Sequence, residues 1–148
     1  QSPTTHTMKR KASAVWRGDL KSGRGTVSTE STVLKDAQYA FGTRFENGPG
    51  TNPEELVGAA HAGCFSMALS AELGKAGFKA EEIATTAHVN FENLPQGGWT
   101  VNTIHLETNA KVPGITPEKF QEIANGAKKG CPISRLLNAA ITLDAKLG

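Results

Sequence analysis

The chain has 148 residues, and 16 Lys and Arg against 14 Asp and Glu give it a formal net charge of +2. A chain of this length buries about two thirds of the surface of its unfolded state, so it can fold as one domain without disulfides. The charges are scattered, with no basic stripe or arginine–aromatic cluster, so nucleic acid is not an expected partner.

The chain shows no secretory signal, and we expect a cytoplasmic protein that does not bind membranes. Its first residues, Gln1–Thr7, are polar and precede Met8. We expect residues 1–8 to be a disordered extension or a remnant of cloning. A single domain is expected to follow over residues 9–148.

The first third of the chain reads as three short strands. Residues 11–16 alternate, and residues 25–33 alternate β-branched with polar side chains. Residues 38–45 are predicted as a third strand, with aromatic side chains at 39, 41 and 45 on one face and Arg44 near its end. Turn residues separate the three, so the sequence predicts an antiparallel meander.

A long helix is predicted over Thr51–Gly77. Asn52 suits the N-cap, Pro53 suits the first helical position, and two glutamates follow in the turn where the helix dipole favours negative charge. Gly74 and Gly77 are suited to a left-handed C-terminal cap.

This helix is apolar nearly all round, which predicts burial on all sides. Its length of roughly 20–25 residues would suffice to cross a bilayer. The glutamates of its first turn, together with His61 and Glu72, favour a protein core instead.

The second half of the chain predicts strands over 83–91 and 99–112, a helix from Thr116 to Gly130, a short helix opening at Cys131, and a final strand over 141–147. The order is β-β-β-α-β-β-α-α-β. Because strands and helices are segregated rather than alternating, the sequence predicts an α+β fold with mainly antiparallel sheet.

Two cysteines, Cys64 and Cys131, are the candidate reactive groups. In a secreted protein they would form a structural disulfide, and in a reducing cytosol they are inert core residues or redox-active thiols. Cys64 lies on the buried helix, where burial raises the pKa of a thiol, so a reactive Cys64 needs a cation beside it. Cys131 lies at a helix N-terminus, which stabilises an anion.

Arg44 is the cation placed best for this role, and Glu54 is its candidate partner. Glu54 precedes Cys64 by ten residues, or about 15 Å along a straight helix, and cannot reach its own Cys64. If Arg44 and Glu54 serve that thiol, they reach it from a second chain, so the chemistry requires an obligate dimer. The alternative is an exposed ion pair at a helix start, worth less than about 1 kcal/mol.

His61 stands one turn before Cys64. It is half of a metal site, a base for Cys64, or a hydrogen-bonded core histidine. His88 and His105 fall on the polar faces of strands and are expected to be solvated.

The segment TNPEELVGAAHAGCFSMALS, with TRF upstream and GCPISRLLNAAITLD downstream, resembles the OsmC branch of the OsmC/Ohr family of thiol peroxidases. The resemblance runs from about Lys9 to Leu147. It implies an OsmC-like fold, with mainly antiparallel sheets wrapped around long central helices. It also implies an intertwined homodimer with two active sites at the interface.

Roles for four residues follow from the resemblance. Cys64 corresponds to the peroxidatic cysteine, which becomes a sulfenic acid, and Cys131 to the resolving cysteine, which closes an intramolecular disulfide. Arg44 matches the arginine that stabilises the thiolate and orients the peroxide. Glu54 matches the carboxylate that holds this arginine, and Glu55 is the less suited alternative.

The resemblance further implies organic hydroperoxides as substrates, with hydrogen peroxide handled less well, in defence against oxidative or osmotic stress. Dithiols such as lipoylated proteins are the implied reductants, and no metal, haem or flavin cofactor is implied. An apolar surrounding would favour alkyl or acyl peroxides. The candidate lining residues are Phe41, Phe45, Phe65, Met67 and Trp99. The rival hypothesis is a small binding module whose cysteines are inert and whose interior holds a hydrophobic ligand or a dimer core.

Overall fold

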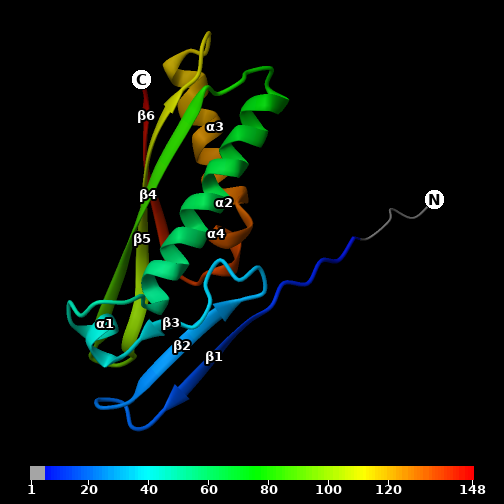
Figure 1. The fold of residues 1–148 in the computed structure, drawn as a ribbon. Coiled ribbons are helices and arrows are strands. Elements are labelled where there is room, and N and C mark those ends of the chain that lie inside the picture. The colour runs from blue at the N-terminus through cyan, green and yellow to red at the C-terminus, as the bar shows by residue number, and fades with distance from the viewer. Residues whose placement is uncertain (1–5) are drawn as a thin grey trace. The chain divides into compact units, whose positions relative to one another are not determined.

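A computed structural model describes residues 6–148, and the predictions for residues 1–5 lie outside the described part. The chain forms two compact units, one ending at Pro53 and the other spanning Glu54–Gly148 (Figure 1). Residues 6–11 form neither helix nor strand.

The first unit contains a three-stranded antiparallel sheet in the order β1-β2-β3. Its strands are β1 (Ala12–Arg17), β2 (Arg24–Thr29) and β3 (Ala37–Tyr39). The predicted meander is therefore confirmed. Strand β2 ends earlier than predicted because the following residues turn, with Thr32 and Asp36 at φ values of 64° and 49°.

The prediction of a strand through residue 45 is wrong beyond Tyr39, because a one-turn helix, α1 (Phe41–Phe45), follows β3. The Thr43 hydroxyl accepts a hydrogen bond from Ala40 N at 2.8 Å and donates one to Ala40 O at 2.9 Å, which closes the chain into a turn. The rings of Phe41 and Phe45, four residues apart, lie 4.9 Å from each other, a spacing that a helical turn also provides. Arg44 thus lies on a helix rather than on a strand.

The second unit is built on a three-stranded mixed sheet. Strands β4 (Glu82–Leu94) and β5 (Gly98–Lys111) are antiparallel, and β6 (Ala140–Leu147) runs parallel to β5. A parallel pair requires a crossover, and helices α3 (Pro117–Gly130) and α4 (Pro132–Leu136) provide it. The α+β class is confirmed, with one parallel pair that the sequence pattern did not predict.

Helix α2 (Pro53–Lys75) ends as predicted, in a Schellman motif. Phe78 N donates to Leu73 O at 2.9 Å, and Gly77 N donates to Gly74 O at 3.0 Å. Gly77 adopts a φ of 91°, which glycine tolerates without steric cost. Leu73 and Phe78 both belong to the hydrophobic core, so the cap also anchors the helix.

Within the single chain, α2 is buried on one face only, which differs from the prediction. That face is made of Gly58, His61, Phe65, Leu69 and Leu73. The opposite face is exposed, because one three-stranded sheet can cover only one side of a helix. By length and composition alone α2 is apolar enough to cross a membrane, but its buried face belongs to the protein core.

The close approach of α2 to the sheet depends on Gly58. A Cβ atom at this position would lie 3.2 Å from Val89 Cγ2 on β4. Figure 1 shows α2 running along the sheet, with α3 on the same side. The core between these layers holds the fully buried Phe65 and Phe120.

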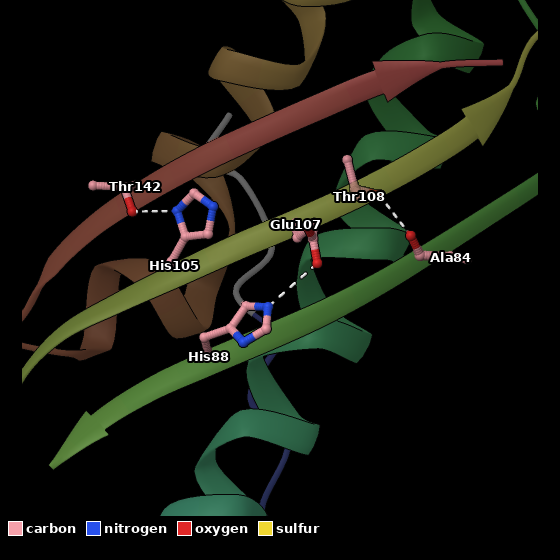
Figure 2. A network of polar contacts seen from close by, with 6 residues as sticks. All are labelled: Ala84, His88, His105, Glu107, Thr108 and Thr142. Carbon is pink, nitrogen blue, oxygen red and sulfur yellow. Dashed lines mark hydrogen bonds and ion pairs between the residues drawn. The ribbon is translucent and has the colours of Figure 1, made fainter.

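The other face of the sheet is polar (Figure 2). His88 and His105 are directly opposite each other in the β4–β5 register. His88 Nε2 lies 3.3 Å from Glu107 Oε1, and His105 Nδ1 lies 2.6 Å from Thr142 Oγ1. The His88 side chain is 56% exposed, as expected for a solvated position, whereas His105 is half-buried.

Candidate active site

The structure brings the two cysteines together although 67 residues separate them. Cys64 lies on α2, and Cys131 lies at the junction of α3 and α4. Their Sγ atoms are 3.0 Å apart, with the Cys131 thiol as hydrogen-bond donor, and both cysteines are free. The sulfur atoms need to approach by only about 1 Å to reach disulfide-bond distance.

Local backbone contacts fix the position of Cys131. Its N–H donates to Ala127 O at 2.9 Å and ends α3, while its carbonyl accepts from Arg135 N at 3.1 Å and begins α4. Pro132 occupies the first position of α4, where its missing N–H leaves no bond unmade. Cys131 is fully buried, whereas Cys64 is partly accessible, so a small molecule reaches Cys64 more readily.

The surroundings of Cys64 oppose its ionisation. Burial raises the pKa of the Cys64 thiol, and the hydrogen bond with Cys131 raises it further. A hydrogen bond from the backbone N–H of Ile133, at the start of α4, lowers the pKa in part. As predicted, burial disfavours the thiolate, so a reactive Cys64 needs a further source of positive charge.

His61 is fully buried, and its Nε2 lies 2.7 Å from Ser134 Oγ on α4. Among residues 6–148 its Nδ1 has no hydrogen-bond partner. Burial lowers the pKa of His61, so the ring is neutral at pH 7. Over residues 6–148 no three His, Cys, Asp or Glu side chains are grouped to hold a metal, so the structure favours a hydrogen-bonded core histidine. The sequence did not predict the contact of His61 with Ser134, because it joins helices far apart in the chain.

Arg44 and Glu54 belong to different units of the chain. The Arg44 guanidinium carbon lies 5.4 Å from the centroid of the Phe45 ring. Glu54 is in the first turn of α2, on the same continuous helix as Cys64, as the reach argument required. The pairing of Arg44 with Glu54 and with Cys64 stays a prediction.

A cavity of about 260 Å³ lies beside Arg44 within the first unit. Two of the predicted lining residues, Phe41 and Phe45, contribute to its wall. Its lining is Trp16, Leu20, Tyr39, Ala40, Phe41, Arg44 and Phe45. The sequence reasoning missed Trp16, whose ring lies 5.5 Å from that of Tyr39. In the β1–β2 register Trp16 stands opposite Gly25, where a Cβ atom would lie 2.6 Å from the Trp16 ring, a contact that local pattern does not reveal.

The other predicted lining residues lie elsewhere in the fold. Phe65 is fully buried in the core of the second unit, whereas Met67 is 77% exposed on α2. Trp99 pairs with Phe91, with ring centroids 4.9 Å apart, at the start of β5 beside the turn from β4. Phe65 therefore serves packing rather than a cavity wall.

Two free thiols thus lie in contact on an α+β scaffold. Residues 46–146 match the family model of the OsmC-like proteins, and the chain belongs to this family. It is 52% identical over 141 residues to the peroxiredoxin OsmC of Escherichia coli, covering 95% of this chain and 98% of that protein. This near full-length identity makes the chain a peroxidase.

More distant relatives also match the chain. The organic hydroperoxide resistance protein of Xanthomonas axonopodis is 30% identical over 101 residues, or 68% of each chain. An OsmC-like protein of unknown function from Vibrio cholerae has a TM-score of 0.76 at 14% identity, covering 94% of this chain and 99% of the other. Because that identity is so low, this structural similarity supports the fold alone.

Proposed function

We propose that the chain reduces organic hydroperoxides through a Cys64 sulfenic acid that Cys131 resolves as an intramolecular disulfide. The observation that carries the proposal is the 3.0 Å contact between the two Sγ atoms. The Cys64 thiolate attacks the terminal peroxide oxygen, an S–O bond forms, the O–O bond breaks, and the leaving alkoxide takes a proton to become an alcohol. Cys64 is oxidised and the peroxide is reduced.

In the second step the Cys131 sulfur attacks the sulfenic sulfur. The S–S bond forms, the S–O bond breaks, and the hydroxide leaves as water with the proton of the Cys131 thiol. A dithiol such as dihydrolipoamide, free or on a lipoylated protein, then reduces the disulfide by exchange. A reducing cytoplasm would keep both thiols free between cycles.

In this proposal, the partner subunit's Arg44 stabilises the Cys64 thiolate. The partner subunit's Glu54 holds that arginine in place. Two observations support this arrangement. Burial raises the pKa of Cys64, so a cation is needed, and Glu54 shares a helix with Cys64 at a distance of ten residues, so it cannot reach its own thiol.

The same arrangement requires a homodimer with active sites at its interface. The exposed face of α2 supports it, because over residues 56–71 that face carries small and apolar residues and no charged one. Its exposed members include Ala59, Ala60, Gly63, Met67 and Ala71. A second copy of the chain would bury this surface and complete the burial that the apolar composition of α2 predicts.

Apolar hydroperoxides are the proposed substrates, with hydrogen peroxide handled less well. The aromatic cavity beside Arg44 supports this preference, because it offers an apolar wall next to a cation. The printed names of the relatives agree, since three of them are organic hydroperoxide resistance proteins.

The test is to add one equivalent of cumene hydroperoxide to the reduced protein and to measure its intact mass and free thiols. The expected result is a loss of two hydrogens per chain, with both thiols becoming unreactive, followed by recovery with dihydrolipoamide. An unchanged mass with both thiols still reactive would contradict the proposal and support the binding module. A panel of peroxides with dihydrolipoamide or glutathione as donor then ranks the substrates and reductants.

A further inference from the structure

Within residues 6–148, two side-chain hydrogen bonds join helix α2 to the start of helix α4, and they have the same spacing along both elements. Cys64 on α2 contacts Cys131 at the start of α4, with 3.0 Å between the sulfur atoms. His61, three residues before Cys64, contacts Ser134, three residues after Cys131, with 2.7 Å between Nε2 and Oγ. The thiol pair and the imidazole–hydroxyl pair are therefore adjacent contacts, about one turn apart, between the same two helices.

The His61–Ser134 contact is part-buried, with the burial on the His61 side. His61 is fully buried and neutral, and its second nitrogen has no partner, so the contact with Ser134 is its single side-chain hydrogen bond in the described chain. Burying an imidazole whose second nitrogen has no hydrogen bond costs folding free energy, on the same buried face as Phe65 and Leu69. An aliphatic side chain would pack there without that cost, but it would not hold α4.

Helix α4 depends on such a contact for its position. It has five residues, too few to be stable alone, and no side chain caps its N-terminus. Its first turn carries the fully buried Cys131 and supplies the Ile133 N–H that acts on Cys64. A shift of this turn by 1–2 Å, on the order of one bond length, would separate the two sulfur atoms.

We propose that His61 is a positioning residue for the disulfide-forming step: its hydrogen bond to Ser134 holds the first turn of α4 against α2 and so keeps Cys131 within reach of oxidised Cys64. This inference rests on the proposed function. The step it serves joins the Cys64 sulfenic acid and the Cys131 thiol into a disulfide and releases water. His61 touches neither the peroxide nor the leaving oxygen in this proposal, and it acts through Ser134.

The consequence lies in the fate of the sulfenic acid. While α4 is held, the Cys131 sulfur captures the sulfenic acid before a second peroxide molecule reaches it. When the hydrogen bond is lost, the sulfenic acid lives longer and a second peroxide oxidises it to the sulfinic acid, which dithiols do not reduce. The first oxidation of Cys64 changes less, because Cys131 and the Ile133 N–H act only on the pKa of its thiol and form no bond in that step.

The test compares Ser134→Ala with Ser66→Ala. Ser66 lies on α2, as His61 does, and makes a part-buried hydrogen bond of 2.8 Å to Thr85 on β4, so its removal costs a similar contact without touching α4. Single-turnover oxidation gives the rate of the first step, and dimedone trapping of the sulfenic acid gives the rate of the second. Mass spectrometry after excess cumene hydroperoxide gives the sulfinic fraction.

For Ser134→Ala we expect a second step slowed by about three- to tenfold, as the loss of one hydrogen bond would give, a smaller change in the first step, and a larger sulfinic fraction. Ser66→Ala should behave as wild type in all three measurements, even if both variants unfold at a lower temperature. His61→Leu should match Ser134→Ala, whereas His61→Gln, whose amide reaches the position of Nε2, should restore most of the rate.

A wild-type second step in Ser134→Ala would overturn the inference, and so would an equal slowing in Ser66→Ala, which would indicate general loss of stability. If His61→Leu does not fold, the Ser134→Ala comparison decides alone. Failure of the proposed function is distinguishable, because the wild-type protein would then form no disulfide with the peroxide at all.

Discussion

The thiol of Cys131 lies 3.0 Å from the sulfur of Cys64, fully buried and directed at it as a hydrogen-bond donor. Cys64 alone of the two is partly accessible. This difference in exposure supports the proposed order of events. In that proposal a peroxide meets Cys64 first, and Cys131 then reacts with the sulfur atom that it already touches.

Replacing either cysteine should separate these two steps. Cys64→Ser is expected to remove peroxide consumption, because the accessible nucleophile is lost. Cys131→Ser is expected to consume one equivalent and then stop, because no disulfide can form and the dithiol has no substrate. Stopped-flow measurement of peroxide loss, at one and at ten equivalents, checks both. Continued turnover of Cys64→Ser would rule out the assigned order.

Two glycines should respond in opposite directions to alanine. Gly77 has a φ of 91° in the cap of α2, so Gly77→Ala is expected to cost about 1 kcal/mol of the free energy of unfolding. Gly126 lies inside α3, and a Cβ atom added there would meet no neighbouring atom within 4 Å. Gly126→Ala is therefore expected to gain about 0.5–1 kcal/mol from helix propensity.

Thermal denaturation of the two variants is the measurement. A change of 1 kcal/mol corresponds to about 2–4 °C in the melting temperature of a domain of this size. Equal shifts in the same direction would contradict the assignment of Gly77 to a left-handed cap.

The elements that the sequence predicted correctly are those with strong local signals. The alternation of residues 83–91 gave β4, and Thr116 before Pro117 gave the start of α3, where its side chain accepts from Lys119 N at 3.2 Å. The one-turn helix α1 was missed because its aromatic spacing of four fits both periods over so short a segment.

Local sequence patterns did not predict the contacts between distant parts of the chain. The 66 residues between Cys64 and Cys131 contain the rest of α2, two strands and helix α3, and nothing in their periodicity places the two sulfur atoms together. The resemblance to a family implied that pair. Neither source implied the contact of His61 with Ser134, which spans 73 residues.

Acid should destabilise the fold through His61. Burial lowers its pKa below the unfolded value of 6.5, so the folded state binds fewer protons than the unfolded chain. The stability associated with the neutral ring is therefore fully present above pH 6.5 and is lost as the pH falls below it. Melting temperatures measured between pH 7.5 and about pH 5 should fall in the wild type and fall less in His61→Gln.

The matched control for this prediction is His88→Gln, which removes an exposed ring from the outer face of the sheet. Its melting temperature should fall on acidification by as much as that of the wild type. If the melting temperature of His61→Gln falls on acidification as much as that of the wild type, groups other than His61 cause the fall.

Arg44→Ala should raise the pKa of the Cys64 thiol. Burial already raises this pKa, and an opposite charge within a few ångströms offsets burial by about 1–3 units. Without the guanidinium, the midpoint of the iodoacetamide alkylation rate against pH is expected to move up by a similar amount, and peroxide reduction at pH 7 should slow accordingly. Arg44→Lys should give an intermediate profile, because it keeps the charge but loses the fork of donors.

Arg135→Ala is the control for this last prediction, because Arg135 is the basic residue in the last turn of α4, the helix that begins at Cys131. If Arg44 supplies the charge, Arg135→Ala leaves the alkylation profile in place, and mixing Arg44→Ala with Cys64→Ser restores part of the activity. The restoration follows because a mixed dimer pairs an intact Cys64 in one subunit with an intact Arg44 in the other. A shift in Arg135→Ala with none in Arg44→Ala would assign the cation to the chain's own α4 and remove the chemical need for a dimer.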